Sequence, residues 1–460
     1  SMASVQHITE MLARIKDGES CTTHNWDNRI VPQTVRSVLK KYDIAHTYNS
    51  AIPVNQDMAL ADRFFEAGLE LAEVLGIQCT ETETIIRFSR EEILDALKQA
   101  PSELFLGSGA DRVVLSARMP EDKTKPLFCT SLSIQIDELL YPELVSELGC
   151  YKGVDILQGP SIDTVFGIPA FSGTPFETAA GIREAKLRSE AVWKAGRPGI
   201  QQMSMSSSVT EFGFMCGFSA NHNPLNPQIG ICLQPSELKT NYCNFNKVLT
   251  ASAFGSFLRT GCPSMIGGYS GPPEGAAIAN IASDILQFVL FGTDISNCSM
   301  YDVRLNSACC RTGLWAMSMS VQATSRNTHT ILDKIINQSA GPCTEEILYT
   351  NAAGLVTTCV SGMELTTGPR SAGGAMKNYI TPLEAYFCAD TFKAAADLKL
   401  DKALEIVDYC LSKYEAQVDD QPKGKSYYDC YDRETRKPIP EWRDMDLRVR
   451  EDLNKRGLNF

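Results

Sequence analysis

From about residue 126 onward, short apolar runs alternate with longer stretches of helical pattern, and this alternation constrains the fold most. Apolar runs separated by helices are typical of parallel strands buried on both faces. About seven such units favour a (β/α)8 barrel, an α/β fold, and no G-x-G-x-x-G follows the first run. Counting alone leaves an open doubly wound sheet as the alternative. The candidate strands are residues 126–129, 154–158, 199–203, 229–233, 264–268, 297–301 and 356–360.

Capping residues mark two of the helices. Ser89 and Glu92 form a capping-box pattern ahead of an apolar stripe that ends at Pro101. Thr174 is expected to cap a second helix, with Pro175 in its first turn and Glu177 closing the box. The pattern predicts a helical lead-in before the barrel and a long helix within it.

The most apolar stretch covers residues 278–291 and lies in a predicted helix that runs from about Glu274 and stops at Gly292. Asn280, Asp284 and Gln287 interrupt it, and no uninterrupted apolar run approaches the roughly 18–20 residues that a membrane span requires. We therefore interpret it as a buried helix of the barrel.

The chain is expected to have three parts. Residues 1–105 form an N-terminal helical extension, residues 106–395 the barrel, and residues 396–460 a C-terminal helix and tail. The last part begins with an amphipathic helix from about Leu398 and continues as a polar tail that packs on the barrel or on a neighbouring subunit.

Charge and cysteine content bound the partners and the compartment. A net charge of −12 without a basic patch argues against nucleic acid. No signal peptide or membrane span is evident, so a cytoplasmic location without membrane association is expected. The sixteen cysteines show no C-x-x-C pairing and only five histidines accompany them, which favours buried reduced thiols over a metal site.

Chemistry in a barrel belongs at the C-terminal ends of the strands. Amides and tyrosines dominate those positions here, which indicates a site for a polar or cationic ligand. Neither a Ser-His-Asp arrangement nor paired carboxylates are apparent, so no hydrolase is indicated. The strand-end residues are Gln158, Gln201, Gln202, Met203, Cys232, Gln234, Tyr269, Tyr301 and Asp302, with Glu274 just beyond.

Five segments together carry a family resemblance. In order and approximate spacing, the chain resembles the monomethylamine methyltransferase family of methanogenic archaea. The segments are 21–27 (CTTHNWD), 195–199 (AGRPG), 267–271 (GGYSG), 340–345 (AGPCTE) and 424–432 (GKSYYDCYD). The resemblance implies a (β/α)8 barrel in a homo-oligomer. It also implies transfer of a methyl group from a methylated amine to the Co(I) of a separate corrinoid protein, with no cofactor bound by the barrel itself.

The resemblance also locates the reacting centre. Family members place pyrrolysine shortly after the AGRPG segment, and Met203 stands at that position here, between Gln202 and Ser204. Two acidic residues that surround pyrrolysine correspond approximately to Ile231 and Gly261. We assign Met203, Gln202, Glu274 and Gln338 as catalytic candidates. As substrate-binding candidates we assign Gln158, Gln201, Gln234, Tyr269, Tyr301 and Asp302, and we assign no metal ligand.

Met203 changes the chemistry that the site can perform. The pyrrolysine imine captures the amine, whereas a thioether is not an electrophile and only fills space. A donor with a fixed positive charge, such as a quaternary ammonium or sulfonium compound, leaves as a neutral molecule and needs no imine. Tyr269, Tyr301 and Phe171 are candidates for an aromatic pocket around such a cation, and Glu274 could balance its charge.

We therefore expect a methyltransferase without pyrrolysine that acts on a quaternary or otherwise N-methylated compound. The alternative is a non-catalytic or repurposed barrel that binds an amine or a corrinoid protein. A metal-dependent enzyme that uses the cysteines is a third hypothesis.

Overall fold

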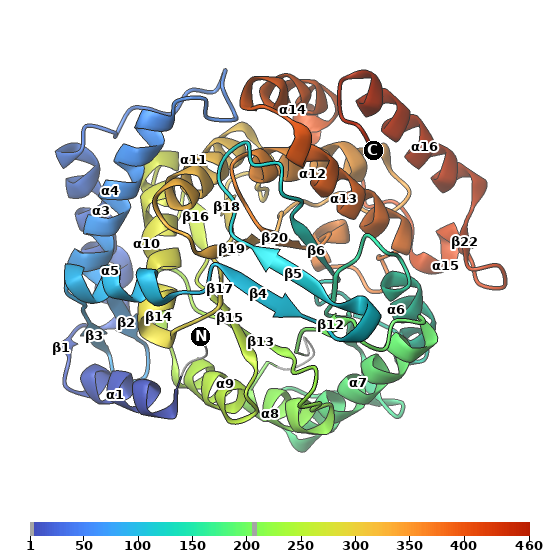
Figure 1. Ribbon diagram of the computed structural model, residues 1–460, viewed down its shortest axis with the longest axis horizontal. Coiled ribbons are helices and arrows are strands. Elements are labelled where there is room, and N and C mark those ends of the chain that lie inside the picture. The colour runs from blue at the N-terminus through green and yellow to red at the C-terminus, as the bar shows by residue number, and fades with distance from the viewer. Residues whose placement is uncertain (1–3, 205–208) are drawn as a thin grey trace.

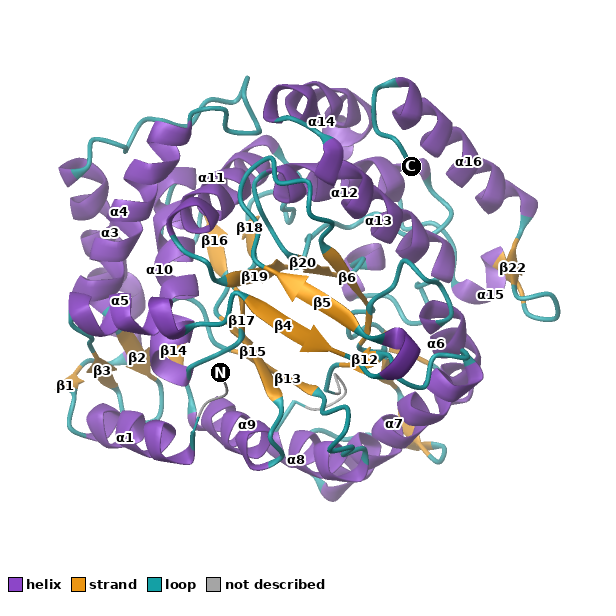
Figure 2. Cartoon of the chain, in the orientation of Figure 1, coloured by secondary structure: helices purple, strands orange, loops and turns teal. Residues whose placement is uncertain are grey.

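The computed structural model describes residues 4–204 and 209–460, and its centre is a barrel of eight parallel strands (Figures 1 and 2). The sheet runs β12-β8-β6-β20-β19-β17-β15-β13, and a parallel bridge between Met203 and Ile229 joins its two ends. The predicted (β/α)8 fold is confirmed. The barrel strands are β6 (Leu127–Thr130), β8 (Ile156–Leu157), β12 (Gln201–Gln202), β13 (Ile229–Leu233), β15 (Phe257–Gly261), β17 (Ile295–Asn297), β19 (Ile331–Lys334) and β20 (Leu365–Thr367).

One helix follows each strand and packs on the outside of the barrel (Figure 2). Within the described residues, only α10 has the length and apolarity of a membrane span, and all of it is buried in the protein, as the sequence predicts. Gly292 ends it in a left-handed conformation with φ of 63°. The helices are α6 (Tyr141–Gly149), α7 (Pro175–Lys194), α8 (Glu211–Ala220), α9 (Tyr242–Ala253), α10 (Pro273–Phe291), α11 (Arg311–Asn327), α12 (Glu345–Val360) and α13 (Pro382–Ala394).

Three predicted strands differ from those observed. Residues 356–360 lie inside α12, so that prediction is wrong. The predictions at 264–268 and 297–301 overlap β16 (Ser264–Ile266) and β18 (Met300–Asp302), which pair in parallel beyond the barrel, although residue 297 also ends β17. A second parallel pair, β7 (Gln135–Ile136) with β9 (Ser161–Ile162), likewise follows β6 and β8. The C-terminal end of the barrel is thus extended on two sides.

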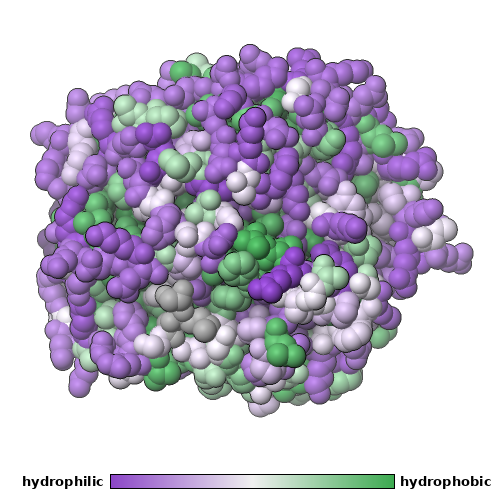
Figure 3. All heavy atoms as spheres, in the orientation of Figure 1, coloured by the Kyte–Doolittle hydropathy of each residue, from purple (hydrophilic) through white to green (hydrophobic). Residues whose placement is uncertain are grey.

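A hairpin closes the opposite end. It consists of β4 (Glu103–Leu106) and β5 (Val113–Ser116) and lies across the opening in Figure 1. Leu104, Leu106 and Leu115 pack with the apolar residues that begin six of the barrel strands. Figure 3 shows the same face, largely hydrophilic with an apolar patch over this hairpin, where Phe105 is 54% exposed. Because the N-terminal end is plugged, a ligand can enter only from the C-terminal end.

The N-terminal region combines helices with a small sheet that the sequence did not indicate. Strands β1 (Glu19–Ser20), β3 (Thr84–Ile86), β2 (Ile77–Cys79) and β14 (Lys239–Thr240) form this sheet. Its main helices are α1 (Val5–Lys16), α3 (Val31–Lys41), α4 (Met58–Leu75) and α5 (Arg90–Gln99), and α4 packs on α10 and α11. The Ser89–Glu92 capping box is confirmed.

The C-terminal region packs on the other side of the barrel. Helix α14 (Leu400–Tyr414) confirms the predicted amphipathic helix, and α14 and α16 (Pro440–Lys455) both contact α12. Between them lie α15 (Tyr427–Cys430) and the short hairpin of β21 (Tyr431–Asp432) and β22 (Lys437–Pro438). The exact limits of the three predicted parts stay predictions.

Candidate active site at the C-terminal mouth of the barrel

Met203 lies on the floor of the barrel interior. Its side chain is fully buried and belongs to an apolar cluster with Ile156, Ile229 and Ile231. The backbone N–H of Met203 donates to the Leu157 carbonyl at 3.0 Å, which fixes the end of β12. The thioether therefore has apolar neighbours on the strands that flank it.

A buried ion pair crosses the interior beside this floor. The Nε of Arg259 on β15 donates to an Asp333 carboxylate oxygen on β19 at 2.5 Å, and the Thr367 hydroxyl donates to the same oxygen at 2.9 Å. Burial raises the pKa of the nearby Cys129 thiol. Sequence reasoning missed this group because charged residues interrupt the apolar pattern of both strands.

Two neighbouring strands carry the positions that correspond approximately to the acidic residues around pyrrolysine in the family. Ile231 is buried on β13, and Gly261 ends β15. A Cβ atom at position 261 would stand 1.4 Å from the Asn297 carbonyl oxygen, so this backbone leaves no room for any side chain. The absence of a carboxylate at 261 is thus built into the packing of β15 against β17.

Three of the predicted glutamines do not face the mouth, and we correct them here. Gln202 points outward, and its side-chain oxygen accepts from Arg188 Nε at 3.0 Å and from Asn221 Nδ2 at 2.9 Å. Gln201 faces the plugged end, where it binds the backbone of Gly107 and Pro227.

Gln234 points toward α10 and donates to Gln287 at 2.8 Å. The fourth glutamine, Gln158, directly follows β8 and is buried, and its side-chain oxygen has no partner among the described residues.

Glu274 and Asp302 are committed to structural contacts. One carboxylate oxygen of Glu274 accepts the backbone N–H groups of Thr47 and Tyr48 at 3.1 and 3.2 Å, which ties the N-terminal region to α10. Asp302 pairs with Arg304 at 2.8 Å. These contacts compete with the charge-balancing role suggested for Glu274 and with the substrate-binding role predicted for Asp302.

The predicted aromatic pocket is not assembled as expected. Tyr269 has the ammonium of Lys239 over its ring at 5.5 Å, so one face is already covered by a cation. Phe171 lies at the surface, 57% exposed, in edge contact with Phe176. Tyr301, the third aromatic candidate, is half-buried and influences the pKa of one charged group.

That group is Arg370, which follows β20. Its Nε donates to the Gly373 carbonyl at 3.0 Å, and its Nη1 donates to the side-chain oxygen of Asn337 at 2.9 Å. Burial lowers the pKa of Arg370, while the neighbouring Tyr301 acts in the opposite direction. Asn337 comes from the loop after β19, so the loops after two adjacent strands meet here.

Gln338 holds these two loops together. Its side-chain nitrogen donates to the Arg370 carbonyl at 2.8 Å and to the Ala340 carbonyl at 2.9 Å, and its oxygen accepts the Ala340 N–H at 2.8 Å. With both ends of its amide engaged, Gln338 is a positioning residue for Arg370 rather than a group that is free to touch a substrate.

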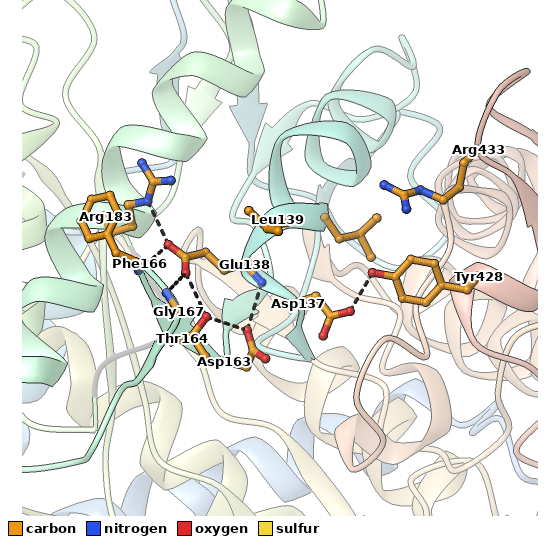
Figure 4. Close-up of a pocket in the computed structure, with 11 residues that line it drawn as sticks. Asp137, Glu138, Leu139, Asp163, Thr164, Phe166, Gly167, Arg183, Tyr428 and Arg433 are labelled. Carbon is orange, nitrogen blue, oxygen red and sulfur yellow. Dashed lines mark hydrogen bonds and ion pairs between the residues drawn. The ribbon is translucent and has the colours of Figure 1, made fainter.

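A hollow lies at the C-terminal end of the barrel, between the loops after β6 and β8 and the C-terminal region (Figure 4). Its volume is about 500 Å³. The Glu138 carboxylate on its wall accepts from Thr164, from the Phe166 and Gly167 N–H groups and from Arg183, as the dashed lines show. The other two carboxylates that line the hollow, those of Asp137 and Asp163, both pair with Lys377 at 2.8 and 2.5 Å, so each acid of the hollow is already engaged.

All sixteen cysteines are free thiols, and thirteen of them are buried, in agreement with the predicted reduced state. In residues 4–204 and 209–460, no group of three or more His, Cys, Asp or Glu side chains is arranged to hold a metal ion.

Known proteins resemble this chain over almost its whole length. The family model for monomethylamine methyltransferase MtmB matches residues 6–458. MtmB3 of Methanosarcina barkeri (strain Fusaro) is 28% identical and MtmB1 of Methanosarcina acetivorans is 27% identical, each over 97% of both chains. The crystal structure of the Methanosarcina barkeri enzyme superposes with a TM-score of 0.92, at 25% identity and with 98% of both chains covered. A structure described as the hydroxylamine MtmB complex matches equally well. The chain belongs to the monomethylamine methyltransferase MtmB family.

Proposed function

We propose that this protein transfers a methyl group from a methylated nitrogen compound to the Co(I) of a partner corrinoid protein, and that it does so without pyrrolysine. Membership of a methyltransferase family supports the reaction class. The single observation that carries the rest is Met203, a fully buried thioether with apolar neighbours at the position that the family resemblance assigns to the reacting residue. No cofactor is bound by the barrel itself in this proposal.

The chemistry restricts the donor. In an in-line displacement, the electron pair of Co(I) forms the bond to carbon, and the pair of the broken C–N bond stays on nitrogen. A neutral amine would have to leave as an amide anion, whereas an ammonium leaves as a neutral amine. We therefore propose that the donor nitrogen is positively charged when the methyl group leaves.

The barrel contributes position and exclusion of water. The hairpin β4–β5 closes one end. The floor around Met203 is apolar apart from the Cys129 thiol, and burial raises the pKa of that thiol, which makes it a poor nucleophile. Leu233, the last residue of β13, is 56% exposed and adds apolar surface at the C-terminal end of this strand. A methyl group that is held between such walls and presented to the open end meets its acceptor along one direction.

The test mixes the protein with a reduced cognate corrinoid protein and a panel of methylamines and betaines, while the absorbance of the methylated corrinoid is followed. Transfer from at least one donor whose nitrogen is positively charged is expected. Absence of transfer from every donor would refute the proposal.

One observation favours a second candidate. Position 261 cannot accept a side chain, and Ile231 and Met203 are apolar. None of the three positions that correspond to pyrrolysine and its two acidic neighbours therefore carries a polar side chain. A barrel that binds an amine or a corrinoid protein without turnover would show this pattern. Calorimetry beside the transfer assay separates the two, since tight binding without transfer supports only the second candidate. Homo-oligomer formation stays a proposal from the family, and a cytoplasmic location stays a proposal from the sequence.

A further inference from the structure

Arg370 is half-buried, and its guanidinium has few partners in the protein. It makes two hydrogen bonds, both to neutral oxygens, and its Nη2 has no acceptor among the described residues. No carboxylate in residues 4–204 or 209–460 lies within ion-pair distance of it. The seven remaining residues, 1–3 and 205–208, are Ser, Met and Ala, so their side chains supply no acid either.

Buried arginines in this protein are neutralised or saturated. Arg259 pairs with Asp333 at 2.5 Å, and Arg188 lies 3.7 Å from Glu184. The Arg118 guanidinium has no ion pair within residues 4–204 and 209–460, but it donates to four backbone carbonyls. Charges that are removed from water are normally paired or fully hydrogen-bonded. Arg370 is partly removed from water and has hydrogen-bonding capacity that the protein does not use, which points to a ligand.

The position of Arg370 in the barrel also favours a ligand at this guanidinium. In chain order β19 and β20 are the seventh and eighth strands of the barrel, and the loops after these two strands form the common anion site of such barrels. A planar guanidinium can donate two parallel hydrogen bonds to a carboxylate or a phosphate, so these groups are its best-matched ligands. Tyr301 on β18 (Met300–Asp302), one of the predicted substrate-binding residues, is near enough to influence the pKa of Arg370.

We propose that Arg370, steered by Asn337 and Gln338, binds the carboxylate of the methyl donor, and that the donor is therefore a zwitterion such as a betaine or an N-methylated amino acid. This inference rests on the proposed function, because it takes the bound ligand to be the methyl donor. A simple methylammonium ion would be repelled by the unpaired guanidinium. A zwitterion brings its own negative charge to Arg370 and leaves the cationic nitrogen, with its methyl group, for the acceptor.

The experiment compares matched ligands by calorimetry, without turnover. Trimethylglycine, dimethylglycine and N-methylglycine are each paired with the cation that lacks the carboxylate: tetramethylammonium, trimethylammonium and dimethylammonium. The wild-type protein is expected to bind at least one zwitterion about 10- to 100-fold more tightly than its matched cation, the range of a charge-assisted hydrogen-bond pair. If no zwitterion is preferred, the inference is overturned.

Variants locate the effect. Arg370→Gln is expected to remove the preference, and Arg370→Lys to keep part of it. Arg443→Gln is the matched control, because Arg443 is exposed and its one ion pair among the described residues is with its neighbour Asp444, so this variant should bind like wild type. Should Arg370→Gln fail to fold by circular dichroism, Asn337→Ala tests the same site by releasing the guanidinium. A preference that survives whichever of these two variants folds overturns the inference.

A third arm tests the other source of an anion, the nucleotide phosphate of the corrinoid. Cobalamin and inorganic phosphate are titrated into the same variants. Loss of their binding in Arg370→Gln, with zwitterion binding unchanged, would overturn the assignment to the donor. Because all arms measure binding, a protein that prefers zwitterions but transfers no methyl group would refute the proposed function and leave this site intact.

Discussion

Replacing Met203 separates packing from chemistry at the floor of the barrel. The side chain is fully buried against Ile156, Ile229 and Ile231. Met203→Ala removes three groups at about 0.8 kcal/mol each, and the residual cavity adds about 1 kcal/mol, so we expect a loss of about 3 to 4 kcal/mol in the free energy of unfolding. Met203→Leu keeps the volume and should cost less than about 1.5 kcal/mol.

The assay pairs urea unfolding with the rate of methyl transfer to the corrinoid protein. Since the thioether is assigned no chemical role, Met203→Leu should transfer methyl groups at close to the wild-type rate, whereas Met203→Ala should lose mainly stability. A tenfold or larger loss of rate in a Met203→Leu protein with normal stability would show that the sulfur takes part in the reaction. That result would refute the reasoning for an inert floor.

Three further predictions concern the surroundings of the site. Gly261→Ala should prevent native packing, because its Cβ would meet the Asn297 carbonyl at 1.4 Å; a soluble variant with a wild-type melting temperature would contradict this. Gln202→Ala should destabilise the protein by about 1 to 3 kcal/mol in urea unfolding, because it strands donors on Arg188 and Asn221, yet leave donor affinity unchanged in calorimetry. Burial raises the pKa of Glu237 from 4.5 to about 7, so the folded protein favours the protonated carboxyl. The contribution of this group to the free energy of unfolding is therefore fully present below pH 4.5. It should then fall by roughly 3 kcal/mol as the pH rises to about 7, and Glu237→Gln should flatten this part of the unfolding profile unless the carboxyl titrates normally.

The sequence predicted the barrel because its periodicity reports burial on both faces. Residues 229–233 gave a strand with the observed limits, since Ile-Gly-Ile-Cys-Leu carries no charge. Strands β15 and β19 were missed because Arg259, Asp333 and Lys334 lie in them. These charges are tolerated in the interior because Arg259 pairs with Asp333, and Lys334 lies 3.6 Å from Asp284 on α10. Pairing of this kind joins residues far apart in the chain and leaves no local pattern.

The candidate site was predicted less completely than the fold, for a related reason. Strand-end position identified Gln201, Gln202 and Gln234, but a shift of one residue along a strand turns a side chain from the interior to the outside. Arg370 was missed because β20, Leu365–Thr367, is too short and too polar to stand out. The glycine-rich segment 368–374 that follows it is the signal that could have drawn attention to this loop.

The most direct test of the central claim is the rate of methyl transfer to the reduced corrinoid protein with and without hydroxylamine, a nucleophile that adds to imines. If the protein works without an electrophilic residue at position 203, the rate with its best donor should be unchanged by hydroxylamine, and the intact mass should show no adduct. Loss of transfer together with a covalent hydroxylamine adduct would contradict the account.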